Sequence, residues 1–214
     1  MSNLTIRIAT RKSPLALQQT KHVASCIKAI APEYHIELKT FQTQGDKFLN
    51  QSLSKIGGKG LFVKELEQAL LNNEADIAVH SMKDVPYELP AGLAIKAILA
   101  REDARDAFLS VSHPSLEMLP ANATIGTSSL RRACQLKALR SDLKIEPLRG
   151  NINTRIAKMN QFDAIILASA GLIRMGFTDQ IKHYLDTNLS LPAAGQGALG
   201  IECRKDDHPL IELL

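Results

Sequence analysis

The stretch from Ala75 to Pro86 carries the side chains whose types and spacing are best suited to chemistry. Asp76 to Val79 has the short apolar run of a buried parallel strand, and the polar residues His80 to Asp84 follow directly, before Pro86 stops a regular continuation. Ligands of open α/β sheets bind at the carboxyl ends of strands. We therefore predict that Asp84 is a catalytic carboxylate, although these residues taken alone are also typical of a solvated turn.

Basic residues gather in the second half of the chain. Between Gly126 and Arg174 there are nine lysines and arginines against three acidic residues, a net charge of +6, whereas the whole chain carries +4. Such a field attracts a polyanion, which is either a nucleic acid or a small molecule with several carboxylates. The interleaving of aromatic and basic residues that single-stranded nucleic-acid binders use is missing, so we expect a small polyanion and no nucleic acid.

Several of these arginines lie where a predicted strand gives way to a helix. Thr124 to Arg132 has a strand, a cluster of Thr and Ser caps and a basic helix start, and Ile145 to Arg155 repeats the arrangement. The helix macrodipole disfavours cations in the first turn. Arg131, Arg132 and Arg155 therefore indicate an anionic ligand that neutralises them; the alternative is that they lie in solvent on the helix surface.

The amino-terminal segment follows the same plan. Ile6 to Ala9 predicts a strand, and Ser13 followed by Pro14 predicts the N-cap and first residue of a helix that runs to about Ile30. Arg11 is then left in the exit turn at a helix N-terminus, which favours anions. Its guanidinium adds a bidentate donor for a carboxylate.

A glycine-rich loop precedes a further helix. Gln44 to Ile56 is polar without a clean period and predicts a loop that covers a ligand, and Gly57-Gly58-Lys59-Gly60 leads into an amphipathic helix predicted over Leu61 to Leu71. A Walker A motif needs Gly-Lys-Ser/Thr, so we reject a nucleotide site. Lys59 remains a candidate donor to a substrate carboxylate.

The order of predicted elements indicates an α/β protein of two similar domains. The charged run Arg101 to Asp106 and the small residues Leu191 to Gly197 are predicted hinge crossings, and Ala198 to Cys203 predicts a strand returning to the first domain. We expect domain 1 to comprise residues 1–99 and 200–214 and domain 2 residues 100–199, with the active-site cleft between them. Thr178 to Leu185 is predicted to be helical.

Composition excludes several classes of protein. Hydrophobic residues make up 45% and charged residues 22%, as in ordinary globular domains. No signal-peptide core or membrane-spanning run is visible, so we expect a cytoplasmic protein without a membrane partner. Cys26, Cys134 and Cys203 form no Cys-x-x-Cys pair and the six histidines show no ligand spacing, which predicts core or reduced thiols and no metal.

Several longer motifs, in the same order along the chain, resemble those of the porphobilinogen deaminases, also called hydroxymethylbilane synthases. The motifs that carry the resemblance are Arg7 to Leu17, Gly57 to Glu67, Ala78 to Pro86, Gly126 to Arg132, Leu148 to Asn151 and Leu191 to Gly197. The resemblance implies a transferase of porphyrin and heme biosynthesis. Members join four porphobilinogen units into hydroxymethylbilane, release ammonia each time, and build the product on a covalent dipyrromethane cofactor. It also implies two lobes like those of type II periplasmic binding proteins.

The resemblance assigns roles to individual residues. It makes Asp84 the catalytic residue and Lys59 part of the substrate loop. The residues that it implies for cofactor binding are Arg11, Ser13, Lys83, Ser129, Arg131, Arg132, Arg149, Gly150, Asn151, Arg155 and Arg174.

The family also has a third domain whose loop bears the cofactor cysteine. None of the three cysteines of this sequence matches that motif, so we expect the chain to correspond to the first two domains, as a monomer that binds porphobilinogen. The alternative is a two-lobed protein that binds polyanions or oligopyrroles without turnover.

Overall fold

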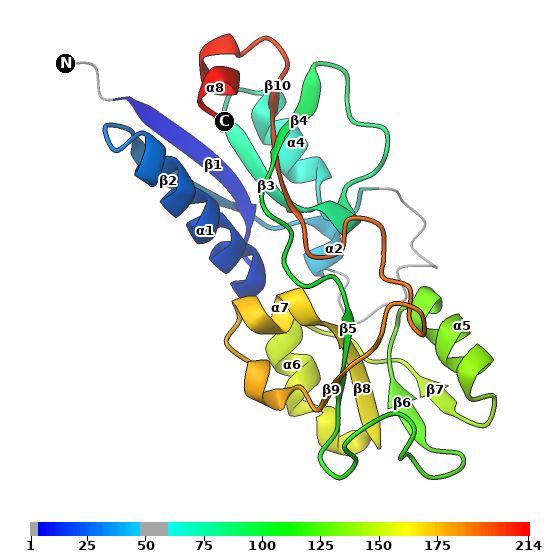
Figure 1. The fold of residues 1–214 in the computed structure, drawn as a ribbon. Helices are drawn as coiled ribbons and strands as arrows, with labels where there is room; N and C mark the ends of the chain where they lie inside the picture. Colours follow the sequence, from blue (N-terminus) through cyan, green and yellow to red (C-terminus); the bar gives the residue numbers. More distant parts are fainter. Residues whose placement is uncertain (1–3, 48–59) are drawn as a thin grey trace. The chain divides into compact units, whose positions relative to one another are not determined.

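The computed structural model describes residues 4–47 and 60–214 (Figure 1). The chain forms two compact units: unit 1 comprises Met1–Ala100 and Ala198–Leu214, and unit 2 comprises Arg101–Gly197. Each unit has its own five-stranded sheet and its own hydrophobic cores. Within the described residues, no helix is both long and apolar enough to cross a membrane.

The sheet of unit 1 has the strand order β2-β1-β3-β10-β4. Its strands are β1 (Thr5–Arg11), β2 (His35–Phe41), β3 (Ile77–Ser81), β4 (Leu93–Ile98) and β10 (Leu199–Arg204). β2, β1 and β3 are parallel, whereas β10 runs antiparallel to both of its neighbours. The last strand of the chain therefore completes the sheet begun by the first.

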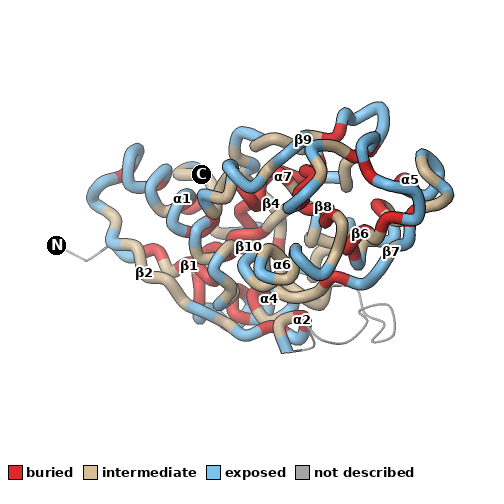
Figure 2. Tube along the Cα trace, turned by 90° about the horizontal axis from the view of Figure 1, so that it is seen from below, coloured by how far each residue is buried: buried red, intermediate tan, exposed pale blue. Residues whose placement is uncertain are grey.

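Helices cover both faces of this sheet. The helices are α1 (Pro14–Ile30), α2 (Gln44–Lys47), α4 (Lys64–Leu71) and α8 (His208–Leu213), with a 3-10 turn, η1 (Met82–Asp84). Val23 and Ile27 of α1 share a core with Leu210 of α8 on one face, while Leu66 and Leu70 of α4 pack on the other. β3 and β10, between these layers, are almost wholly buried (Figure 2).

The sheet of unit 2 has the order β7-β6-β8-β5-β9. Its strands are β5 (Asp106–Leu109), β6 (Thr124–Gly126), β7 (Lys144–Glu146), β8 (Ala164–Ala168) and β9 (His183–Tyr184). β7, β6 and β8 are parallel, and β5 is antiparallel to β8 and β9. Unit 2 thus repeats the pattern of unit 1, with three parallel strands followed by an antiparallel one.

Helices also cover both faces of the second sheet. They are α5 (Leu130–Leu139), α6 (Ile152–Ala157) and α7 (Ser169–Arg174), with the 3-10 turns η2 (Met159–Gln161) and η3 (Thr178–Gln180). Leu136 of α5 enters one core, and Leu172 of α7, with Ile152 and Ile156 of α6, packs in the other. The predicted α/β class with two similar lobes is confirmed.

Some sequence-based predictions of local structure are wrong. The predicted helix over 178–185 is only the turn η3 followed by β9, because His183 and Tyr184 pair with β5. The helix expected from Leu61 begins at Lys64, after a turn. Gln44–Lys47, placed in a loop, forms α2. Cys134, expected in a core, is exposed on α5.

Candidate functional site

Asp84 lies at the carboxyl end of β3, in the turn η1, and is half-buried. β1 and β3 are parallel neighbours, so their carboxyl ends meet at one edge of the sheet. A small pocket of about 20 Å³ opens at this edge. Its lining residues are Arg11, Ala16, Gln19, Phe62, Val63, Val79, His80, Ser81 and Asp84. The structure therefore brings together the predicted catalytic carboxylate and one of the predicted carboxylate-binding arginines.

Arg11 is the last residue of β1 and not part of the exit turn. Its Nε donates to Asp46 Oδ2 over 3.2 Å, a second guanidinium nitrogen bonds Oδ1 of the same carboxylate, and the guanidinium lies 4.2 Å from the ring centre of Phe62. Burial would raise the pKa of Asp46, but hydrogen bonds and charge from Arg11, with hydrogen bonds from Thr43, lower it. Arg11 is thus held against a carboxylate of its own chain.

Two polar residues of this pocket were not identified from the sequence. Gln19 is buried on α1, and its Nε2 donates to Ser81 Oγ over 2.8 Å. His80 is the penultimate residue of β3, and its Nε2 lies 2.9 Å from Oε2 of Glu202 on β10. A polar residue among the apolar positions of a helix or strand is the signal that points to such sites.

Three of the predicted cofactor-binding residues cap helices. Ser13 accepts the Ala16 N–H at the start of α1, Ser129 accepts the Arg132 N–H at the start of α5, and Asn151 accepts the Thr154 N–H at the start of α6. In each cap only the side-chain oxygen is used, as an acceptor. The hydroxyl hydrogen of serine and the amide hydrogens of asparagine can still donate to another group. These side chains can therefore fix a helix and still donate to an anion.

Arg131 and Arg132 bind the same buried carboxylate, that of Asp106 at the start of β5. Arg131 donates to Asp106 Oδ2 over 2.7 Å and Arg132 to Oδ1 over 2.7 Å. Ser190 Oγ and Gln196 Nε2 donate to the same carboxylate over 3.2 and 3.0 Å. Burial would raise the pKa of Asp106, but the charge and hydrogen bonds of Arg132, with those of Gln196 and Arg131, lower it.

Asp106 is a partner within the chain for Arg131 and Arg132, the two arginines from which the helix dipole led us to infer an anionic ligand, and that ligand stays a prediction. The side chain of Arg132 is only 7% exposed, and one of its guanidinium nitrogens donates to the Ile166 carbonyl over 3.1 Å. Arg131 is 25% exposed and also donates to the Leu191 carbonyl over 2.5 Å, so it is the more accessible of the two.

Arg155 lies in the last turn of α6, not in the first as expected, so the macrodipole favours its charge there. Its Nε donates to the Gly150 carbonyl over 2.8 Å. Gly150 has φ of 112°, and a Cβ built there would lie 2.7 Å from Thr154 Cγ2. Only glycine fits this turn. Arg149 is half-buried and precedes Gly150 in the chain, so this turn has one arginine next to it in sequence and a second, Arg155, bonded to its carbonyl.

The remaining predicted residues are dispersed. Arg174, at the end of α7, donates to the Gly197 carbonyl over 2.7 Å, and burial lowers its pKa. Lys83 is exposed in η1, beside Asp84. Lys59 lies outside the described residues. In the ranges 4–47 and 60–214, no group of three or more His, Cys, Asp or Glu side chains could hold a metal ion.

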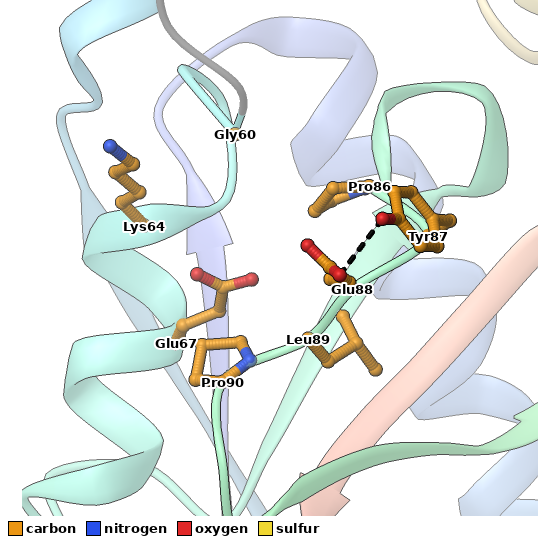
Figure 3. A pocket seen from close by; sticks show the side chains of 8 residues that line it. All are labelled: Gly60, Lys64, Glu67, Pro86, Tyr87, Glu88, Leu89 and Pro90. Carbon is orange, nitrogen blue, oxygen red and sulfur yellow. Dashed lines mark hydrogen bonds between the residues drawn. The ribbon is translucent and has the colours of Figure 1, made fainter.

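A second, larger pocket of about 470 Å³ lies in unit 1 (Figure 3). Its lining residues are Gly60, Lys64, Glu67, Pro86, Tyr87, Glu88, Leu89 and Pro90. Tyr87 donates its hydroxyl to Glu88 over 2.8 Å. Burial, together with the charge of Glu202, raises the pKa of Glu67. Its lining thus carries two carboxyl groups, those of Glu67 and Glu88, and one ammonium group, that of Lys64.

The chain is similar in fold to bacterial two-lobed binding proteins. A nutrient-binding protein of Burkholderia cenocepacia bound to methionine has a TM-score of 0.59 at 14% identity, with 97% of this chain and 89% of that chain covered. A putative methionine-binding lipoprotein of Bacillus subtilis has a TM-score of 0.58 at 15% identity, with 98% and 87% covered. A YaeC-family lipoprotein of Enterococcus faecalis has a TM-score of 0.58 at 17% identity, with 99% and 89% covered. The class is thus the α/β two-lobe fold of the periplasmic binding proteins.

A family description narrows this class. The family described as "Porphobilinogen deaminase, dipyromethane cofactor binding domain" matches residues 6–212. The chain belongs to the porphobilinogen deaminase family, whose members are transferases of tetrapyrrole biosynthesis.

Proposed function

We propose that this chain joins four porphobilinogen units head to tail into hydroxymethylbilane, with release of ammonia, on a dipyrromethane cofactor. One observation carries the proposal: a member of this family brings Asp84 and Arg11 to one pocket, at the carboxyl ends of two adjacent parallel strands. Each joining step breaks the C–N bond of the substrate's aminomethyl group and forms one C–C bond. The amino group leaves as ammonia, and the proton lost by the attacking pyrrole carbon passes through the carboxylate of Asp84 to solvent. On release of the product, one water molecule would supply its hydroxyl group and return a hydrogen to the cofactor pyrrole carbon.

Asp84 acts on the positive charge that the reaction creates. Its carboxylate accepts a hydrogen bond from a pyrrole N–H of the substrate, stabilises the cationic pyrrole and takes the proton that the pyrrole carbon loses. Asp84 is half-buried beside a pocket that has room for about one water molecule. In such a water-poor setting, one ion contact contributes several kcal/mol to the transition state.

The arginines bind the acetate and propionate groups of the substrate and of the growing product. Guanidinium groups suit this role because they bind carboxylates through two parallel hydrogen bonds. When substrate binds, Arg11 gives up its hydrogen bonds to the Asp46 carboxylate and donates to a substrate carboxylate in its place. One carboxylate acceptor thus replaces another of the same kind. We propose that Lys59 contributes a further donor.

The side chains of unit 2 fit an acidic cofactor such as dipyrromethane. Arg132 Nε is buried without a partner among the described residues, so an acceptor at the start of α5 would complete its hydrogen bonding. The proposed cofactor-binding residues of unit 1 are Arg11, Ser13 and Lys83, and those of unit 2 are Ser129, Arg131, Arg132, Arg149, Gly150, Asn151, Arg155 and Arg174. When bound, the dipyrromethane supplies the terminal pyrrole to which the first substrate unit is joined. We further propose that the protein works in the cytoplasm as a monomer.

Ammonia release and intact mass, measured together, test this function. The chain is incubated with porphobilinogen; ammonia is assayed and the protein mass is recorded before and after. We expect ammonia release from the unmodified chain and none from Asp84→Ala. A mass increase in steps of one pyrrole unit would show in addition that one of Cys26, Cys134 and Cys203 carries the growing product. A chain that is folded but yields no ammonia and no increase in mass contradicts the proposal.

A further inference from the structure

The carboxyl end of β3 and the turn η1 after it contact β10, and Ala198 just before β10, at three points. His80 Nε2 lies 2.9 Å from Glu202 Oε2, and the Met82 N–H donates to the Ala198 carbonyl over 3.0 Å. Gly200 is the β10 residue opposite His80. A Cβ at Gly200 would lie 2.2 Å from Met82 Sδ, so the Met82 side chain occupies the space that the glycine leaves open.

The polar contact among these three is buried. The side chains of His80 and Glu202 are only 3% and 1% exposed. A carboxyl group removed from water to this extent is retained only with a partner that matches its charge or hydrogen bonding. Glu202 Oε2 bonds His80, whereas Glu202 Oε1 has no partner among the described residues. The hydrogen bond to His80 therefore fixes the orientation of both side chains.

Glu67 of α4 adds to this cluster from the helix above the sheet. Its Oε1 is buried without a partner among the described residues. Burial first, and then the charge of Glu202, raise the pKa of Glu67, while His80 and Lys64 act in the opposite direction. His80, Glu202 and Glu67 thus form one buried polar cluster beneath α4.

His80 also lines the same pocket as Asp84. Only Ser81, Met82 and Lys83 separate the two residues, and Met82 is itself held by β10. The position of the segment that carries Asp84 is therefore determined by the end of β3 at His80 and by the contacts of Met82 with β10 and the residue before it.

We propose that His80 and Glu202 are positioning residues for Asp84, and that β10, through Glu202 and Gly200, holds the carboxylate of Asp84 in its working position. The proposal rests on the proposed function for the role of Asp84, but the geometry that it describes is independent of turnover. Carboxylate orientation matters because displacement of a catalytic group by about 1 Å can cost about a hundredfold in rate.

Glu202→Gln tests the proposal, since glutamine keeps the size of the side chain and removes its charge. Gly200→Ala is the second variant, because the atoms nearest to a Cβ at this position belong to Met82 and, farther away, to Ile95. Two measurements are made on the full chain: hydrogen exchange of the backbone amides of residues 82–85, and the steady-state rate of ammonia release from porphobilinogen.

The matched control is Asp76→Asn. Asp76 lies just before the opposite end of β3, and its carboxylate bonds the guanidinium of Arg7 over 2.7 and 3.0 Å. The control therefore removes a partly buried charge next to the same strand, far along the strand from Asp84.

We expect Glu202→Gln and Gly200→Ala to speed exchange at residues 82–85 and to lower kcat, each at least about tenfold, with KM changed less than about twofold. We expect Asp76→Asn to lower global stability without either effect. Unchanged exchange at 82–85 in both variants overturns the proposal, as does unchanged kcat with faster exchange. If unmodified protein releases no ammonia, the proposed function fails, and the exchange measurement alone decides whether β10 holds this segment.

Discussion

Removal of the Asp106 carboxylate should destabilise unit 2 severely. Asp106 is fully buried and accepts hydrogen bonds from Arg131, Arg132, Ser190 and Gln196. Asp106→Ala leaves the buried guanidinium of Arg132 without its counter-charge, and breaking a buried pair in this way costs about 3–5 kcal/mol. Because domains are stable by only about 5–15 kcal/mol, a large part of the stability of unit 2 should be lost.

Urea unfolding measures this loss, with hydrogen exchange of the β8 amides as a readout specific to unit 2. The control is Asp142→Ala, which removes the same kind of carboxylate from a more exposed pair with Arg140, where N and O are 2.7 Å apart; this carboxylate also accepts the Asn122 N–H over 3.0 Å. Ion pairs nearer the surface contribute less, so the control should lower the urea midpoint much less than Asp106→Ala does. If Asp106→Ala moves the midpoint no further than this control does, the reasoning about the buried arginines is wrong.

The same carboxylate predicts a dependence of stability on pH. The pKa of Asp106 is lowered in the folded protein, so its contribution to stability is fully present above the ordinary carboxyl pKa of about 4 and is lost as the pH falls through the lowered value. The unmodified chain should therefore lose stability steeply below about pH 4. Asp106→Asn should flatten this acid limb in urea titrations at several pH values.

Three further outcomes are expected. Asp84→Ala should lower ammonia release by about a hundredfold or more with an unchanged circular dichroism spectrum, and near-normal turnover would contradict its assigned role. The pKa of Glu67 is raised by burial and by the charge of Glu202, so ionised Glu67 destabilises the folded protein above that pKa. Glu67→Gln should therefore raise the urea midpoint at pH 8 and change it less at pH 4. A larger effect at pH 4 than at pH 8 would contradict this pH dependence. Gly197→Ala should lower the melting temperature more than Gly176→Ala does. Both glycines have positive φ (91° and 72°), but only at Gly197 would a Cβ lie 2.3 Å from the Glu102 carbonyl oxygen. Equal decreases in melting temperature would contradict this reasoning.

Local chemistry was sufficient to predict much of the fold. Ser13 and Pro14 define the start of α1, because a hydroxyl cap and a residue without an N–H suit that position. The helix runs from Pro14 to Ile30 as expected. Where tertiary pairing competes with a local pattern, prediction failed: His183 and Tyr184 pair with β5 although the pattern around them is helical.

The sequence by itself predicted that Asp84 and Arg11 lie at the carboxyl ends of parallel strands, and the structure places both in the lining of one pocket there. The sequence could not determine which acidic groups the arginines contact. Asp46 lies 35 residues from Arg11 and Asp106 lies 25 residues from Arg131, and no local spacing encodes such pairs. Only the tertiary structure decides them, because a buried charge binds whichever complementary group the fold brings within hydrogen-bonding distance.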